Sequence, residues 1–386
     1  MKISTDRILT THVGSLPRPD DLLELLIQED RGEDVDQDAL QAKTAAAIKT
    51  AVKEQVDNGV DVVCDGELGK MSYHIYAKHR LNGISNVDGS GVPGRKAPRD
   101  LQDFDGLDIE QLAGGGTNLM QATGCTGPVS YDDPAPVQRD IDNLKAAADA
   151  AKPIDLFMNS ASPGCLSTYV PNQYYPSRDE YRSALVAAMK PEYDAIHQAG
   201  FVLQLDCPDL AGSRHTDYQD MSEKEFLADA EKSIEALNAA TADIPPEAMR
   251  MHICWLNYPG PHTHDIPIIK LIDLLNKARP AGLLFEGANP RHEHEWEDWT
   301  SVKINDDKIL IPGVVDSTSN YVEHPVLIAQ RICRYADIVG RERVLAGTDC
   351  GFGTYAGRKR VFPSVVLGKF RAMAEGAKIA TERLWG

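Results

Sequence analysis

Eight short apolar segments, each followed by polar residues, run through the sequence at intervals that suit alternating strands and helices. Their centres lie near residues 9, 61, 155, 203, 252, 284, 312 and 346. From Asp206 onward the residues that end these segments recur at steps of about 30 to 48, as Asp206, Cys254, Glu286, Asp316 and Cys350. Repeated strand–helix units of this size form a parallel sheet, and eight of them close into a (β/α)8 TIM barrel of the α/β class. An open doubly wound sheet is the alternative, but no Gly-x-Gly-x-x-Gly follows the first segment.

Amphipathic helices are predicted between the apolar segments. The longest cover residues 38–58, 178–198, 222–240, 325–339 and 363–383. Residues 70–135 interrupt the pattern, because they are rich in glycine, proline and aspartate and hold only short β-like pieces. We therefore predict a single TIM-barrel catalytic domain over residues 1–386 with an irregular, β-rich insertion at 70–135.

Charge and cysteine usage narrow the functional class. The formal net charge of −18 argues against nucleic acid and against an anionic membrane surface as partners. The seven cysteines are scattered and odd in number, unlike a disulfide framework. No signal peptide is recognisable, and no apolar run approaches the ~18 residues of a membrane span. We expect a cytoplasmic protein with free thiols, and a homo-oligomer stays open.

His252, Cys254, Glu286 and Cys350 are candidate metal ligands. On a strand, His252 and Cys254 share one face because they are two residues apart. One nitrogen, two sulfurs and a carboxylate suit tetrahedral zinc, with the carboxylate able to give way to a substrate. For each residue alone, the alternative is packing in the core. For the set, the spacing gives metal binding and core packing about equal weight. A zinc-bound thiol loses its proton near neutral pH, so such a site suits thiol alkylation.

Five further residues are candidate substrate contacts. Asp206 ends an apolar strand, where it could bind a substrate ammonium or carry a proton; the alternative is that it caps a loop. The same two interpretations apply to Glu67. Ser15 can offer its hydroxyl and backbone N–H to a carboxylate. His12 is either a residue at the edge of the core or a substrate contact. Tyr258 suits stacking on a flat ring, against aromatic core packing.

Two His-x-His pairs lie in predicted loops, at His262 and His264 and at His292 and His294. A second metal site is weighed against solvated polar loops, and the loops are favoured by about three to one. The acidic run over residues 293–298 is interpreted as a solvated face.

Together these residues resemble the catalytic barrel of cobalamin-independent methionine synthase over most of the chain outside residues 70–135. Residues 11–17 are similar to the family's Ile-Gly-Ser-Phe-Pro loop, and residues 65–67 to the Gly-Glu that meets the amino-acid substrate. Residues 204–208 are similar to its Ile-Asp-Glu-Pro segment, and the four candidate ligands match its zinc set one by one. The resemblance implies a zinc-dependent transferase that moves a methyl or other alkyl group from a small-molecule donor to a small-molecule thiol.

In this resemblance Asp206 and Glu67 hold the ammonium of the acceptor, and Ser15 helps to hold its carboxylate. The sequence departs from the family at Cys207, where a glutamate is expected, and at residues 160–164, where a Thr-Gly-Pro loop is expected. It also has about half the length of the two-barrel synthase. Epoxyalkane:coenzyme M transferase, a similar single barrel that opens an epoxide with a zinc thiolate, is therefore the alternative. A metal-free decarboxylase related to uroporphyrinogen decarboxylase and a non-catalytic binding protein remain further alternatives.

Overall fold

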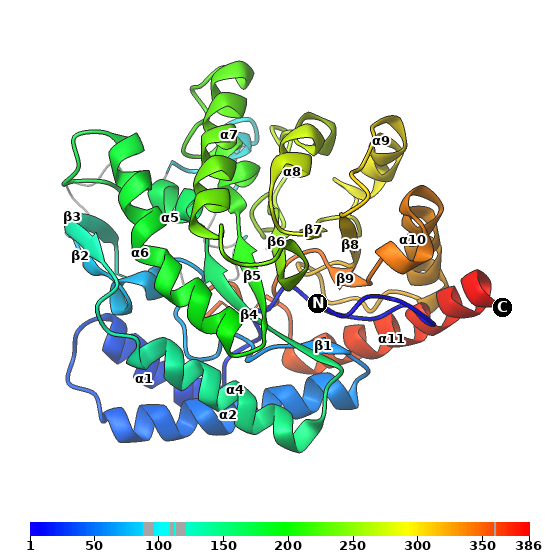
Figure 1. Cartoon of the computed structure of the whole chain (residues 1–386), viewed down its shortest axis with the longest axis horizontal. Helices are drawn as coiled ribbons and strands as arrows, with labels where there is room; N and C mark the ends of the chain where they lie inside the picture. Colours follow the sequence, from blue (N-terminus) through cyan, green and yellow to red (C-terminus); the bar gives the residue numbers. More distant parts are fainter. Residues whose placement is uncertain (88–95, 109–111, 113–120, 359) are drawn as a thin grey trace.

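Parallel strands form the centre of the computed structural model, in the order β1-β4-β5-β6-β7-β8-β9 (Figure 1). They are β1 (Val62–Val63), β4 (Asp155–Ala161), β5 (Val202–Asp206), β6 (Met249–His252), β7 (Gly282–Phe285), β8 (Ile309–Val315) and β9 (Gly347–Thr348). The first apolar segment closes the ring, because Thr11 N donates to Ala346 O at 2.8 Å and Val62 N donates to Thr10 O at 3.0 Å. The eight predicted strand positions and the barrel fold are thereby confirmed.

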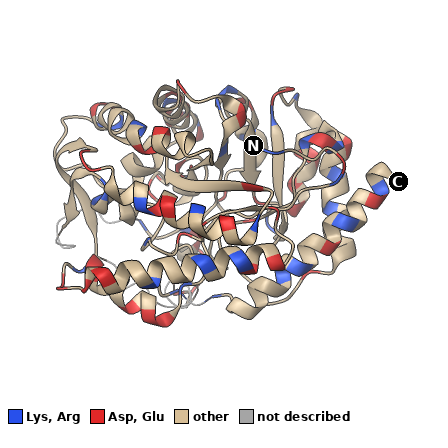
Figure 2. Ribbon diagram, turned by 60° about the horizontal axis from the view of Figure 1, so that its bottom comes forward, with Lys and Arg blue, Asp and Glu red and all other residues tan. Residues whose placement is uncertain are grey.

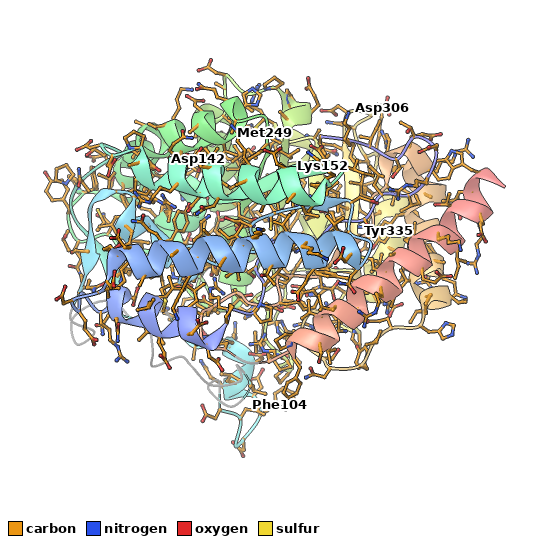
Figure 3. The ribbon with its side chains drawn as sticks, turned by 90° about the horizontal axis from the view of Figure 1, so that it is seen from below. Phe104, Asp142, Lys152, Met249, Asp306 and Tyr335 are labelled. Carbon is orange, nitrogen blue, oxygen red and sulfur yellow. The ribbon has the colours of Figure 1, made fainter. Side chains whose placement is uncertain are left out.

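Helices surround the strands. Those of ten or more residues are α1 (Asp20–Asp30), α2 (Gln37–Asp57), α4 (Ala135–Ala151), α6 (Arg178–Gln198), α7 (Glu223–Ala240), α10 (Pro325–Val339) and α11 (Pro363–Trp385). Shorter ones are α5 (Pro163–Tyr169), α8 (Ile272–Lys277) and α9 (Trp296–Ser301). The five helices predicted above agree with this set to within two residues at either end. Figure 3 shows α2 and α4 lying side by side, with α11 next to them.

The barrel interior is filled by one face of each strand. Its apolar members are Leu9, Val62, Phe157, Val202, Leu284, Ile311 and Leu345. Arg250 crosses the interior, donating to Gln204 Oε1 at 2.8 Å and lying 3.6 Å from the centre of the Phe157 ring. Alternate residues of a strand face the same side. Asp206 and His252 therefore continue the inward face at the carboxyl ends of β5 and β6, where barrels carry their active sites.

The insertion contains a two-stranded antiparallel sheet of β2 (Asn82–Asn86) and β3 (Thr123–Ser130), which confirms its predicted β character. The structure describes residues 1–87, 96–108, 112, 121–358 and 360–386. Residues 88–95, 109–111 and 113–120 of the predicted insertion lie outside these ranges.

A second part of the insertion reaches the barrel mouth through the 3-10 helix η2 (Arg99–Gln102). The buried Asp100 carboxylate accepts hydrogen bonds from the Tyr258 hydroxyl at 2.7 Å and from the His262 backbone N at 2.6 Å. Phe104, nearby in the chain, lies at the edge of the molecule (Figure 3). These two bonds tie the insertion to the loop that follows β6.

Acidic and basic residues are interspersed along the outer helices (Figure 2). Within the described ranges, no helix combines the length and the apolar character needed to cross a membrane.

Replacing Gly14 with alanine should lower the free energy of unfolding by about 2–4 kcal/mol. Gly14 has φ +141°, and an added Cβ would lie 2.5 Å from Asn159 Oδ1. Asn159 Nδ2 donates to Val13 O at 2.9 Å, so it cannot move without losing this bond. Chemical denaturation measures the loss. Gly32→Ala is the matched control, because Gly32 has φ +72° with nothing within 4 Å of an added Cβ; an equal loss in both variants would contradict the steric argument.

Candidate active site and metal centre

A cavity of about 460 Å³ opens at the carboxyl end of the barrel. This volume suits a small-molecule site. Seven of the residues singled out from the sequence line it: Ser15, Glu67, Asp206, His252, Cys254, Tyr258 and Cys350. The insertion contributes Lys96, Ala97 and Pro98 to the wall, so it covers part of the mouth.

The ligand atoms of His252, Cys254 and Cys350 lie within 4.8 Å of one another, and all three residues are buried. The two Sγ atoms are 3.7 Å apart, which is far longer than a disulfide bond. His252 Nε2 is buried without a hydrogen-bond partner among the described residues, and its Nδ1 lies 3.6 Å from Asp206 Oδ1. The strand ends of β6 and β9 thus bring together three residues that form a candidate metal site.

These residues fit zinc. Two sulfurs at the usual ~2.3 Å from a tetrahedral zinc ion lie about 3.8 Å apart, close to the observed separation. The hydrogen bond from Cys350 is the main cause that lowers the pKa of the Cys254 thiol, in spite of its burial. Burial alone would lower the pKa of His252, but the contact with Asp206 together with the charges of Cys254, Asp206 and Glu286 outweighs burial and raises this pKa. Thiolate sulfur and imidazole nitrogen are the donors that zinc prefers.

Glu286 follows β7 and lies beside this cluster. Its Oε1 accepts from Trp255 N at 3.1 Å, and its Oε2 accepts from Asn289 Nδ2 at 2.7 Å and from Arg291 at 2.8 Å. The carboxylate is therefore held in one orientation by three donors. It is not among the described residues whose ligand atoms meet within 4.8 Å, so its ligation stays a prediction.

Glu67 and Asp206 form an acidic wall of the cavity. Glu67 Oε2 is buried without a hydrogen-bond partner in the described part of the chain, and the residue itself is 3% exposed. Burial, and then the charge of Asp206, raises the pKa of Glu67 to about 8. Asp206 Oδ1 accepts from Gln204 Nε2 at 3.1 Å and lies near His252. A buried carboxylate with a free oxygen suits a cationic group of a ligand.

The remaining predicted contacts separate into two groups. Ser15 lines the cavity together with Cys350. Its Oγ lies against Gly351, the residue after Cys350, because a Cβ added to Gly351 would meet this oxygen. Tyr258 lines it too, but its hydroxyl is bonded to the insertion. His12 is fully buried, with Nε2 2.8 Å from Gln55 Oε1, and is not among the described residues that line the cavity. His12 is thus packed inside the core of the described chain, and a contact with substrate stays a prediction.

Other lining residues were not singled out from the sequence. They are Tyr73, Thr216, Asn257, Thr354, Tyr355 and Arg358. Asn257 and Thr354 follow soon after the strand-end ligands Cys254 and Cys350, and this position in the chain was the available signal. Tyr73 carried no such signal, because it lies at the edge of the irregular insertion.

In each His-x-His pair, one histidine is buried against Asp265 and the other is not. His262 and His292 are buried and both face Asp265, whereas His264 is bonded to Asp103 and is partly exposed. His294 is exposed. The interpretation of residues 293–298 as a solvated face is wrong for Glu295, which is 5% exposed and bonded to His292 at 2.9 Å.

Comparisons with known proteins show similar sequences and a similar fold, although no family model matches the sequence. The methionine synthase of Sulfolobus acidocaldarius is 22% identical over 378 residues, covering 97% of this chain and 93% of that protein. The methionine synthase of Sulfurisphaera tokodaii is 24% identical over 376 residues with the same two coverages. A solved B12-independent methionine synthase from Shewanella sp. W3-18-1, in complex with selenomethionine, has TM-score 0.69 and 18% identity over 98% of this chain and 99% of that chain. Full-length relatives and a shared barrel fold therefore agree with the motifs, and the chain is similar over nearly its whole length to methionine synthases, of which the solved one is B12-independent.

Proposed function

We propose that this chain transfers a methyl or other alkyl group to the thiol of an amino-acid acceptor of the homocysteine type. The observation that carries the proposal is the meeting of His252, Cys254 and Cys350 in the same cavity as an acidic pair. The full-length relatives named above are methionine synthases, which supports the same reaction.

His252, Cys254 and Cys350 would hold the zinc ion, and we keep Glu286 as the proposed fourth, exchangeable ligand. Zinc bound there supplies a Lewis acid that keeps the acceptor sulfur ionised at neutral pH. The three donors, of which Arg291 is charged, would stabilise the Glu286 carboxylate, so that it can leave the metal ion without becoming an unpaired buried anion.

The side chains of the cavity orient the acceptor. Glu67 and Asp206 would bind its ammonium, because Glu67 Oε2 has no partner of its own. Ser15 would bind its carboxylate with its hydroxyl and backbone N–H. Asp206 is also the candidate proton carrier, since it lies next to His252. Fixing the thiol and the alkyl donor in one cavity replaces a bimolecular encounter by an aligned reaction, which accounts for much of an enzyme's rate.

A paired substrate assay tests the proposal. Zinc-loaded protein is mixed with homocysteine or with 2-mercaptoethanesulfonate, each with methylfolate or with epoxypropane, and loss of thiol and formation of thioether are followed. We expect product with homocysteine and a methyl donor. Product only with epoxypropane would instead indicate the epoxide-opening reaction. Absence of thioether in all four mixtures, from protein that holds zinc, would contradict the proposal.

A further inference from the structure

A second cluster of metal-ligating side chains lies outside the proposed active centre. His215, His262 and Asp265 have ligand atoms within 4.8 Å of one another. They come from the loops after β5 and β6, and His292 from the loop after β7 contacts the same carboxylate. The side chain of Asp265 is 8% exposed and those of the three histidines are at most 2% exposed.

The hydrogen-bond partners of His262 fix its tautomer. Its Nε2 lies 2.9 Å from Tyr258 O, and because a carbonyl oxygen only accepts, this nitrogen carries the hydrogen. In neutral His262 the Nδ1 lone pair then faces the Asp265 carboxylate at 2.9 and 3.1 Å. Two electron-rich atoms at this distance need a cation between them, either a proton or a metal ion.

His215 also faces the Asp265 carboxylate without a hydrogen bond to it. Its Nδ1 lies 3.0 Å from Asp265 Oδ1, yet neither ring nitrogen makes a hydrogen bond with the described residues. The ring is therefore close to the carboxylate but does not direct an N–H at it. A nitrogen and an oxygen bound to one tetrahedral zinc ion lie about 3.3 Å apart, so the separation suits joint ligation.

His292 completes the surroundings as a hydrogen-bond donor. Its two nitrogens contact Glu295 Oε2 at 2.9 Å and Asp265 Oδ2 at 3.0 Å. Because carboxylate oxygens accept hydrogen bonds, both ring nitrogens of His292 act as donors. His292 contacts Oδ2 of Asp265, whereas His215 faces Oδ1 at 3.0 Å and His262 Nδ1 lies within 3.1 Å of both oxygens. Metal-bound carboxylates and histidines generally have such outer partners.

We propose that His215 Nδ1, His262 Nδ1 and Asp265 Oδ1 bind a second zinc ion, in a structural site separate from the proposed catalytic one. The ion would fix the loop after β6, in which Leu256 and His262 have positive φ angles of 70° and 53°. That loop carries Tyr258 into the cavity wall. The inference does not depend on the reaction proposed above.

Zinc content of the purified full-length protein and of its variants tests the site. We expect about two zinc ions per chain in the wild type and about one in Cys254→Ser/Cys350→Ser, which leaves this cluster intact. His215→Gln should also hold about one. His264→Gln is the matched control, because His264 lies in the same loop but faces Asp103, and it should keep both ions. With cobalt in place of zinc, the ion that remains in the double cysteine variant should show no sulfur-to-metal charge-transfer band.

A folded double cysteine variant that holds no zinc or cobalt would overturn the second site, whether or not His215→Gln folds. The two proposals fail in different ways. If the wild type holds one ion that the double cysteine variant keeps, the second site stands and the proposed catalytic centre fails. If the wild type holds one ion that the double cysteine variant loses, the second site fails and the proposed function is untouched.

Discussion

Cys254→Ser should remove zinc from the active centre and lower kcat/KM for thiol alkylation by about a thousand-fold or more. A metal ion that stabilises developing charge contributes several kcal/mol to the transition state, and each 1.36 kcal/mol is about tenfold in rate. Serine is a poor zinc ligand at neutral pH, so the site would retain only His252 and Cys350 of its three meeting ligands. Zinc analysis and steady-state kinetics on the same preparation measure both losses.

Cys333→Ser is the matched control for this variant. Cys333 lies half-buried on α10, away from the residues that line the cavity, and should leave zinc content and rate unchanged. An active Cys254→Ser protein that keeps its full zinc content would contradict the proposed centre. Parallel loss of activity in both variants would point to general damage from thiol removal instead.

The barrel was predictable because its strands are buried on both faces and therefore read as continuous apolar runs. Strand ends could be located to within a few residues from the polar residue that stops each run, as at Asp206 and Glu286. Parallel strands bring these ends to one edge of the sheet. The meeting of His252, Cys254 and Cys350 followed from that rule and from the alternation of side chains, without any knowledge of the loops.

Contacts between loops could not be predicted from the sequence in the same way. Asp265 gathers His215, His262 and His292 from three different loops, and no periodicity relates these four positions. The sequence interpretation considered the histidines in neighbouring pairs, whereas the fold selects one member of each pair. Burial of Glu295 was missed for the same reason, since an acidic run in a loop carries no sign of the partner that neutralises it.

The insertion shows a second limit. The Asp100–Tyr258 bond joins residues 158 positions apart, and neither residue lies in a patterned element. From the sequence, Tyr258 suits stacking on a flat ring or packing in the core. Its hydroxyl instead anchors the insertion, which a sequence pattern cannot reveal because the energy of a buried hydrogen bond depends on both partners.

Glu67→Gln should lower kcat/KM for homocysteine by about 10- to 100-fold while leaving a thiol without an ammonium, such as 2-mercaptoethanesulfonate, nearly unaffected. A charge-assisted hydrogen bond contributes about 1.5–3 kcal/mol, and glutamine keeps the shape of the side chain but not its charge. Comparing the two thiols in wild type and variant separates recognition of the ammonium from damage to the site. An equal loss for both thiols would contradict the assignment of Glu67 as an ammonium ligand.

The pH dependence of binding gives an independent measure of the same contact. Burial and the charge of Asp206 raise the pKa of Glu67 to about 8, so the empty site holds a proton on this carboxyl group at neutral pH. Only the ionised carboxylate pairs with an ammonium, and the incoming acceptor must therefore release that proton. Affinity for homocysteine should rise as the pH rises toward about 8, by up to about tenfold per unit. Calorimetry in buffers of different ionisation enthalpy should show proton release on binding to the wild type, and the release from this group should vanish in Glu67→Gln; equal release from both proteins would place the proton elsewhere.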